Sequence, residues 1–373
     1  MNLSIGIVGL PNVGKSTLFN ALLKKQVAYA ANYPFATIEP NVGIVEVPDH
    51  RLAELAKLVN AARIVPATVE FYDIAGLVAG ASQGEGLGNK FLSHIREVAA
   101  IAHVARVFED GDVVHVANSV DAARDIGIID TELILADLAT LEKQREPKGK
   151  ASKEELLRWD AVQKLKTHLN DGKPARTCEL SDDEAKEARS LQLLTMKPQI
   201  FVFNVSEKQL EDKAGTEKKI EEILKQVQDD KETTSDQLQA KNYIYLNAKL
   251  ENDVLAFSEE EQKEYLEQFD LTDTGLNRLI KKAYEILGLI SYLTCGEIEA
   301  RAWTIENGTL APDAAGAIHT DFTKKFIKAD IVAYDKFIEA GGWVKAREKG
   351  IVQTVGKDYV MKDGDVTEFK IGN

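Results

Sequence analysis

The chain has 373 residues, enough for two or three domains, and its 44% hydrophobic and 28% charged residues are typical of a globular protein. Its formal net charge of −14 argues against a protein that coats DNA or RNA, because phosphate binding needs clustered Lys and Arg. One local basic face is still allowed. The two cysteines, Cys178 and Cys295, fit neither a disulfide framework nor a zinc or redox motif.

The chain offers no membrane or export signal. No apolar run reaches the roughly 18 residues of a membrane-spanning helix. The N-terminus enters an apolar strand pattern at once, which leaves no room for a signal peptide. No long heptad array demands a dimer. We therefore expect a cytoplasmic monomer with neither a membrane nor a DNA partner.

A phosphate-loop pattern follows the first predicted strand. Residues 9–16, GLPNVGKS, fit G-x-x-x-x-G-K-[ST], and residues 17–22 continue with helical spacing. The two loop glycines let successive N–H groups turn inward, and the helix N-terminus adds partial positive charge. Lys15 is expected to contact the β- and γ-phosphates as the catalytic lysine, and the Ser16 hydroxyl to ligate Mg²⁺. The predicted nucleotide contacts here are Gly9, Asn12, Val13, Gly14, Lys15, Ser16 and Thr17. The alternative is a Gly-rich turn without a ligand.

Strand and helix patterns alternate as far as residue 108. Strands are predicted at 42–47, 67–76 and 101–108, with helices at 51–59 and 90–97. Alternation of these lengths favours an α/β fold, with a mostly parallel sheet and helices on both of its faces.

Three further residues are candidates for the phosphate end of the site. Asp73 ends a predicted strand, where an acid beside Mg²⁺ belongs, and Gly76 would bring its N–H to the γ-phosphate. Thr37, in a loop with two prolines, is the candidate second hydroxyl ligand of Mg²⁺. It could instead make only a local hydrogen bond.

The residue after Gly76 is Leu77, where many P-loop GTPases place a glutamine that orients water. Leucine has no donor or acceptor, so hydrolysis is slow or another polar group replaces it. His115 is our candidate catalytic residue for that role. A purely structural histidine in an apolar stretch is the alternative.

A helical segment interrupts the sheet pattern. Apolar residues recur at helical spacing from about residue 131, and capping boxes begin at Ser152 and Ser181, the second opening a helix predicted over 185–194. We expect residues 131–197 to form an inserted helical hairpin. The sheet pattern then resumes with predicted strands at 199–204 and 242–246 and helices at 217–227, 259–269 and 275–287.

The end of the predicted strand at 199–204 and the residues after it carry a candidate base-recognition motif. GTPases read guanine with Asn-Lys-x-Asp, whereas this chain has Asn204, Val205, Ser206 and Glu207. Glu207 is one methylene longer than Asp, which displaces the carboxylate and should spoil its paired contact with guanine. Losing such a contact costs several powers of ten in discrimination, so ATP should be tolerated or preferred. Asn204 could also be a plain loop residue after a strand.

The last 85 residues or so read as a small α+β unit. Strands are predicted at 300–305, 331–334, 358–361 and 366–369, with a helix-like stretch at 321–327. A lysine and arginine cluster could face RNA, although a solvated surface explains it equally well. It comprises Lys324, Lys325, Lys328, Lys345, Arg347 and Lys349.

Taken together, these motifs resemble the Obg-like ATPase family, also called YchF. The resemblance rests on GLPNVGKST, ANYPFATIEP, DIAGLVAGAS, GEGLGNKFL and NVSE, and on the C-terminal ARAWTI, IHTDF and DGDV. It implies a G-domain-like P-loop unit at 1–130 and 198–288, a helical or coiled-coil insert at 131–197, and a β-grasp TGS domain at 289–373. TGS is a module shared with threonyl-tRNA synthetase.

The resemblance further implies an ATPase that prefers ATP to GTP, requires Mg²⁺ and associates with the ribosome, either the large subunit or the 70S particle. Asn12 matches an asparagine linked in related GTPases to an activating K⁺ ion, and Ala248 lies in a segment loosely like the second base-contacting loop. An rRNA contact could come from the TGS domain or the insert. The resemblance also supports His115 as the substitute for the missing glutamine.

Two alternatives differ in class from an ATP-driven switch. The chain could be a GTP-selective translation or ribosome-assembly GTPase, or a nucleotide-gated binding scaffold whose hydrolysis is incidental. A small-molecule kinase is a more distant alternative, because nothing in the sequence reads as an acceptor pocket or a lid.

Overall fold

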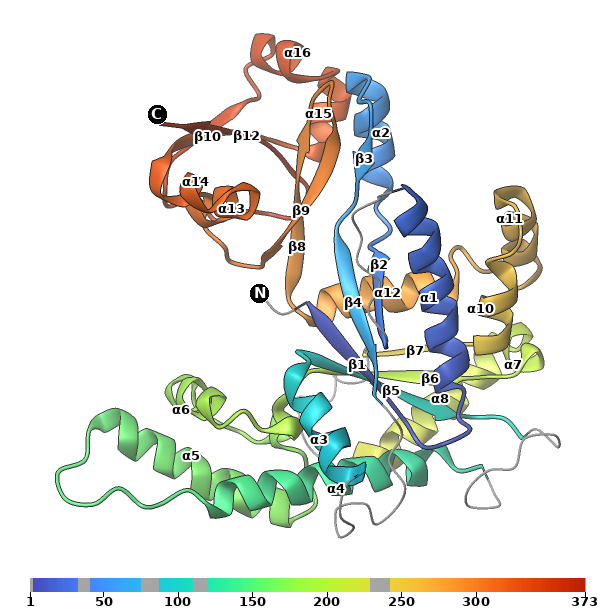
Figure 1. The fold of residues 1–373 in the computed structure, drawn as a ribbon, viewed down its shortest axis with the longest axis vertical. Helices are drawn as coiled ribbons and strands as arrows, with labels where there is room; N and C mark the ends of the chain where they lie inside the picture. Colours follow the sequence, from blue (N-terminus) through green and yellow to red (C-terminus); the bar gives the residue numbers. More distant parts are fainter. Residues whose placement is uncertain (1–2, 33–40, 75–86, 110–119, 229–241, 373) are drawn as a thin grey trace. The chain divides into compact units, whose positions relative to one another are not determined.

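The computed structural model describes residues 3–32, 41–74, 87–109, 120–228 and 242–372. The chain divides into two compact units. The first comprises Met1–Ile44 with Glu70–Leu279, and the second comprises Val45–Val69 with Ile280–Asn373. Figure 1 labels their helices and strands. Among the described residues, no helix is long and apolar enough to cross a membrane.

The first sheet has six strands in the order β2-β4-β1-β5-β6-β7. They are β1 (Ser4–Val8), β2 (Val42–Glu46), β4 (Thr68–Asp73), β5 (Ala100–Arg106), β6 (Gln199–Asn204) and β7 (Tyr243–Leu246). The pairs β1–β4, β1–β5, β5–β6 and β6–β7 are all parallel. The predicted α/β class with a mostly parallel sheet is therefore confirmed.

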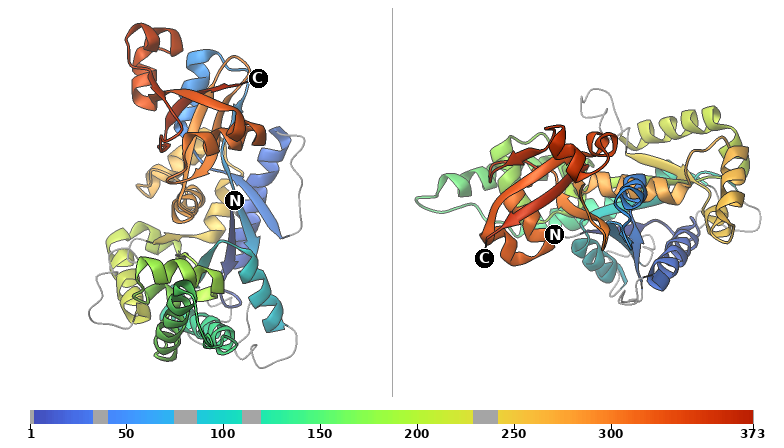
Figure 2. Two further views of the ribbon diagram at one scale, coloured as in Figure 1. Left: turned by 90° about the vertical axis from the view of Figure 1, so that its left-hand side faces the viewer. Right: turned by 90° about the horizontal axis from the view of Figure 1, so that it is seen from above.

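Helices cover both faces of this sheet. Every residue of β1, β5 and β6 is buried, which requires a covering layer on each side. Helices α4 (Ala122–Glu142) and α8 (Lys213–Gln228) share one core with Phe203 and Tyr245 of the sheet. Helix α1 (Lys15–Asn32) packs against α10 (Ala248–Val254). Helices α1 and α8 lie on opposite sides of the sheet (Figure 2).

The helices that accompany this sheet extend from the phosphate loop to the end of the first unit. They are α1 (Lys15–Asn32), α3 (Leu87–Glu97), α4 (Ala122–Glu142), α5 (Lys153–Asn170), α6 (Asp182–Ala188), α7 (Glu207–Glu211), α8 (Lys213–Gln228), α10 (Ala248–Val254), α11 (Glu259–Gln268) and α12 (Gly275–Ile286).

The helical insert has a core of its own. Helix α4 continues into it, and α5, α6 and three short 3₁₀ turns at Ala175–Thr177, Arg189–Leu191 and Leu194–Met196 complete it. The Asp137 carboxylate accepts hydrogen bonds from the Leu194 and Thr195 N–H groups at 2.7 and 2.8 Å, which fasten the last turn to α4.

The helix predicted over 185–194 is wrong in its extent. Helix α6 ends at Ala188, and Gln192 adopts a left-handed backbone with φ of 50°. The chain turns here because Leu191 and Leu193 are both buried in the insert core, which a continuous helix would not allow.

The second unit contains a mixed six-stranded sheet in the order β11-β10-β12-β8-β9-β3. Its strands are β3 (Ile64–Val65), β8 (Leu289–Cys295), β9 (Ala300–Glu306), β10 (Phe326–Ala333), β11 (Gln353–Val355) and β12 (Asp365–Ile371). Its helices are α2 (His50–Val59), α13 (Ala311–Ile318), α14 (Thr320–Lys325), α15 (Tyr334–Ala340) and α16 (Trp343–Glu348). This separate sheet with helices confirms the predicted C-terminal α+β fold.

Two sequence expectations differ in this unit. Residues 358–361 do not form a strand: Val360 makes one isolated bridge to Leu310, and the Tyr359 N–H donates back to the Gly356 carbonyl, closing a turn. Residues 45–69 group with the C-terminal residues because β3 pairs in parallel with β9. A two-residue strand carries no hydrophobic period, so no sequence pattern indicates this pairing.

Candidate nucleotide-binding site

The phosphate loop joins β1 to α1 in the arrangement that the motif requires. Gly14 has φ of 101°, and Asn12 has φ of 64°, both in the left-handed half of backbone space. A Cβ on Gly14 would lie 2.3 Å from the Asn204 Nδ2. Helix α1 begins at Lys15, so its first N–H groups and the positive end of its dipole lie at the loop.

Lys15 is the charged residue most enclosed by the loop. Only 8% of it is exposed. Burial lowers the pKa of the Lys15 ammonium below its ordinary value of 10.5, and the Asp73 carboxylate acts in the opposite direction. A desolvated ammonium is stabilised by any anion that reaches it, so the site favours an anionic group, of which phosphate is one.

A cavity of about 900 Å³ opens beside the loop. Its walls come from the phosphate loop and from the segments that follow β5, β6 and β7. Because parallel strands end at the same edge of a sheet, this is where an open α/β sheet binds ligands. The lining residues are Pro11, Asn12, Gly14, Lys15, Ser16, Thr17, Arg106, Phe108, Asn204, Ser206, Glu207, Lys208, Asn247, Ala248 and Lys249.

Asn204 connects the two halves of the cavity wall. Its Nδ2 donates to the Val13 carbonyl at 3.0 Å, and its Oδ1 accepts from the Ala248 N–H at 3.0 Å. Both amide atoms are thus committed to the backbone, and the side chain is buried. Asn204 therefore fixes the phosphate loop against the start of α10.

The remaining base-motif residues separate in space. Val205 is fully buried in the core shared by α4 and α8 and does not line the cavity. Ser206 caps α7, with its Oγ accepting from the Gln209 N–H. Glu207 follows in the first turn of α7, is exposed, and lines the cavity. Of these three residues, Ser206 and Glu207 line the cavity and Val205 does not.

Several lining residues were missed by sequence reasoning. Arg106 is 3% exposed, donates from Nη1 to the Asn12 carbonyl at 3.3 Å, and has its guanidinium 5.5 Å from the Phe108 ring centroid. Lys208 and Lys249 add two exposed cations at the rim. Arg106 is the last residue of β5, and Lys208 and Lys249 follow β6 and β7 by a few residues. That position at the carboxyl ends of the strands was the available signal.

Some predicted site residues lie away from the cavity lining or outside the described residues. Gly9 and Val13 belong to the loop but do not line the cavity. Thr37, Gly76, Leu77 and His115 lie outside the described residues. The predicted ligands of Mg²⁺ that are described are Ser16, which is exposed to the cavity, and Asp73, at the end of β4.

The donor set suits Mg²⁺ bound together with a nucleotide. Across the described ranges, no three His, Cys, Asp or Glu side chains gather as a metal site. A triphosphate and water supply most oxygen ligands of Mg²⁺ in such sites, so one hydroxyl and one carboxylate are enough. Ser16, which lines the cavity, and Asp73, at the end of β4, are the residues that would supply that pair.

Comparison with known proteins decides the family. Residues 4–129 match a family described as "50S ribosome-binding GTPase", and residues 289–372 match YchF-GTPase_C, described as "Protein of unknown function (DUF933)". The "Ribosome-binding ATPase YchF" of Bacillus subtilis is 46% identical over 376 residues, covering 99% of both chains. Its namesake in Pasteurella multocida is 44% identical over 375 residues, again with 99% of each chain covered. The chain belongs to the YchF family.

A solved YchF structure has the same fold. The chain titled "Structure of the Schizosaccharomyces pombe YchF GTPase" superposes with a TM-score of 0.85 at 37% identity, covering 99% of this chain and 98% of that one. The family predicted from the sequence motifs is therefore confirmed, and the phosphate loop lies in the part matched to the GTPase family.

The predicted basic cluster of this YchF chain lies in the second unit and is partly neutralised. Arg347 on α16 forms an ion pair with Glu368 at 2.5 Å, and Glu368 also pairs with Lys370. The Lys349 ammonium donates to the Glu339 carbonyl. These contacts favour the solvated-surface interpretation for this part of the cluster.

Proposed function

We propose that this chain is a Mg²⁺-dependent ATPase that binds the ribosome and changes conformation with its nucleotide. The observation that carries the proposal is the cavity itself, in which a phosphate loop with a buried lysine faces a base-side wall that presents Glu207. Support for the activity and the partner comes from the relatives named "Ribosome-binding ATPase YchF".

At the phosphate end of the site, we assign roles in binding phosphate or Mg²⁺ to four residues. Lys15 binds the β- and γ-phosphates, while Ser16 and Asp73 hold Mg²⁺, with Thr37 as a further ligand. Bound Mg²⁺ would neutralise phosphate charge. Asn12 is the proposed contact for an activating K⁺ ion. Its left-handed backbone (φ of 64°) and exposed side chain support that role.

Hydrolysis needs a group that orients the attacking water. Leu77 cannot supply it, so we assign that role to His115. In the variant His115→Ala, nucleotide affinity should be kept and ATP turnover lost. Unchanged turnover would remove His115 from the mechanism, whereas lost affinity would point to a structural role.

Base selection is assigned to Glu207. An aspartate reads the N1–H and 2-amino group of guanine together, and the longer Glu side chain displaces that carboxylate. Adenine lacks this donor pair, so the site loses discrimination against ATP. Val205 stands at the lysine position of Asn-Lys-x-Asp, but it is buried in the core and therefore does not cover the base. Glu207 acts from the first turn of α7.

The deciding experiment is competition between ATP and GTP for the purified chain, in the wild type and in Glu207→Asp. We expect ATP to bind at least as tightly as GTP in the wild type, and the aspartate variant to gain affinity for GTP. The matched control is Glu211→Asp, which makes the same change at the end of α7, outside the cavity lining. Clear GTP preference in the wild type would overturn the base argument.

A GTP-selective ribosome-associated protein is the second candidate. The matching family is described as "50S ribosome-binding GTPase" and the solved relative is titled a "YchF GTPase", so the printed names differ on the nucleotide. The same competition decides between them. Pelleting of the chain with large subunits and with 70S particles, with and without nucleotide, then tests ribosome binding and its nucleotide dependence.

The division into three functional parts also remains a proposal. We assign nucleotide binding to residues 1–130 and 198–288, the insert to 131–197, and a TGS-like module to 289–373. The insert's own core supports its separate treatment. Limited proteolysis with and without nucleotide would test whether these boundaries are the first to be cut.

A further inference from the structure

The loop that joins α4 to α5 and the first turns of α5 form a basic surface. We call this surface the insert tip and define it as residues 143–159. The tip carries six basic and three acidic side chains, a net charge of +3 on a chain whose total is −14. The basic residues are Lys143, Arg145, Lys148, Lys150, Lys153 and Arg158. All but Arg158 are exposed. The loop lies at the end of the helical hairpin away from the first sheet (Figure 1).

Most of these basic side chains form no ion pair within the described residues. Of the six cations, Lys153 alone has an ion pair within the described residues, with Asp183 at 3.9 Å. The Glu155 carboxylate accepts from the Ser152 N–H at 2.8 Å as part of the α5 capping box. This carboxylate is therefore held at the start of α5 and forms no ion pair with a lysine of the loop in the part of the chain that the structure describes.

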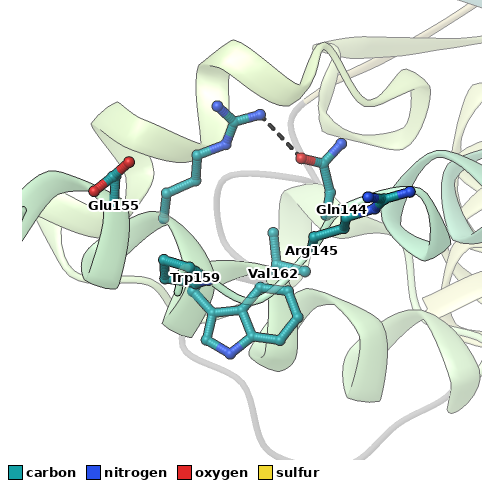
Figure 3. Close-up of a pocket in the computed structure, with 7 residues that line it drawn as sticks. Gln144, Arg145, Glu155, Trp159 and Val162 are labelled. Carbon is teal, nitrogen blue, oxygen red and sulfur yellow. Dashed lines mark hydrogen bonds between the residues drawn. The ribbon is translucent and has the colours of Figure 1, made fainter. Parts of the chain in front are cut away.

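A pocket of about 210 Å³ lies within the tip (Figure 3). Arg158 donates from Nη2 to the Gln144 Oε1 at 3.1 Å, which holds the guanidinium along one wall. Trp159 packs against the insert core with part of its side chain and contributes the rest to the pocket. The lining residues are Gln144, Arg145, Pro147, Glu155, Arg158, Trp159 and Val162.

We infer that the insert tip binds single-stranded RNA, with phosphates on the loop lysines and one unpaired base in the pocket. Single-stranded nucleic acid is recognised by a basic surface together with aromatic or guanidinium planes on which bases stack. The tip offers both. The carboxylates of an acidic protein segment would pair with the lysines but would leave the plane of Trp159 unused. The inference deepens the proposed ribosome association and rests on it.

The loop lysines are tested by the salt dependence of RNA binding. A fluorescein-labelled single-stranded RNA of about 12 nucleotides is titrated with the full chain between about 50 and 200 mM salt. For Lys148→Ala/Lys150→Ala, we expect weaker binding and a slope of log K against log salt that is shallower by about 1.4, since each lost phosphate contact removes about 0.7.

The matched control removes the same charge elsewhere. Lys218→Ala/Lys225→Ala changes two exposed lysines on α8 and should keep the wild-type slope. If both double variants lose the same affinity and slope, the RNA responds to net charge rather than to the tip, and the inference is overturned.

The pocket is tested separately with Trp159. Trp159→Leu should weaken RNA binding roughly 5- to 100-fold, as expected for one lost stacking contact, and Trp159→Phe should restore most of it. Circular dichroism melting checks that each variant is folded. If Trp159→Leu is destabilised, Arg145→Ala takes its place, because Arg145 lines the pocket and is exposed. Its RNA affinity is compared with those of the wild type and Trp159→Phe, and it should be the weakest of the three. Unchanged RNA affinity in both Trp159→Leu and Arg145→Ala would overturn the pocket assignment.

Ribosome pelleting and ATP turnover on the same variants separate the two proposals. Absence of wild-type ribosome binding or turnover contradicts the proposed function. Wild-type ribosome binding that Lys148→Ala/Lys150→Ala does not weaken contradicts the tip assignment alone. Weakened ribosome binding with unchanged affinity for free RNA would assign the tip to a ribosomal protein instead, and would also overturn the inference.

Discussion

A Cβ atom on Gly14 would lie 2.3 Å from the Nδ2 atom of Asn204, closer than any side chain tolerates. The same Nδ2 donates to the Val13 carbonyl, one residue before Gly14. The phosphate loop and the end of β6 are thus in direct contact, although Gly14 and Asn204 are 190 positions apart in the sequence. The shape of the phosphate-binding loop therefore depends on the residue that opens the base-side wall.

Gly14→Ala should abolish most nucleotide binding while the chain stays folded. The φ of 101° is strained for alanine, and the added Cβ displaces Asn204. We expect ATP affinity to fall by roughly 5- to 160-fold, since strain of about 1–3 kcal/mol acts at the binding loop. Titration with a fluorescent ATP analogue measures it. Gly127→Ala is the control: it lies in α4 with no atom within 4 Å of the new Cβ, and should bind normally.

Asn204→Ala should lower both stability and nucleotide affinity. The substitution leaves the Val13 carbonyl and the Ala248 N–H without their side-chain partner, at a cost of about 1–3 kcal/mol in the free energy of unfolding. Urea denaturation of the nucleotide-free chain gives this value. Asn170→Ala, which removes an exposed local bond within α5, should change the free energy by less than about 0.5 kcal/mol. Equal effects at the two positions would contradict the bridging role.

As the pH is raised, the affinity for ATP should begin to fall at a lower pH than it would if Lys15 had the ordinary pKa of a lysine. Burial lowers the pKa of Lys15 below 10.5, so in the free chain the ammonium loses its proton, and with it the attraction for phosphate, as pH rises through that lowered pKa. Affinity for ATP is measured from neutral pH upward. Lys15→Arg stays protonated, so its affinity, though lower overall, should be flat over this range. Lys24→Arg, exposed on α1, should keep the wild-type profile.

Stability should depend on pH through His103, which is buried in β5. Burial, with help from the Arg176 and Lys15 charges, lowers the pKa of His103 to about 3. Between pH 6.5 and about 3 the unfolded chain binds a proton that the folded chain excludes, so stability is lost as pH falls, by up to about 1.4 kcal/mol per pH unit.

His103→Gln should remove that share of the pH dependence. Between pH 6.5 and 4, the free energy of unfolding of His103→Gln in urea should change less steeply with pH than that of the wild type, whatever its absolute value. Some slope remains, because other groups titrate in both proteins. The exposed His319→Gln is the matched control and should retain the wild-type slope. Identical slopes in all three proteins would show that His103 is not excluded from protonation by the fold.

The sequence alone determined the features that depend on local order. The phosphate loop, the parallel-sheet class and the capping boxes at Ser152 and Ser181 follow from residue types at short, fixed spacings, and the structure has each of them. The family followed from the order of such motifs along the chain. Local hydrogen bonding and backbone sterics act over a few residues, which is why a linear pattern records them.

Only the tertiary structure decided which distant residues share a wall of the site. Val205 is buried in the core, whereas Glu207 lines the cavity. Arg106 donates a hydrogen bond to the carbonyl of Asn12, and residues 45–69 belong to the same unit as the C-terminal sheet. These outcomes depend on how sheet edges and helix faces pack, and burial is settled by the whole fold. No spacing within the sequence encodes it, because the contacts that bury a residue come from segments far away along the chain.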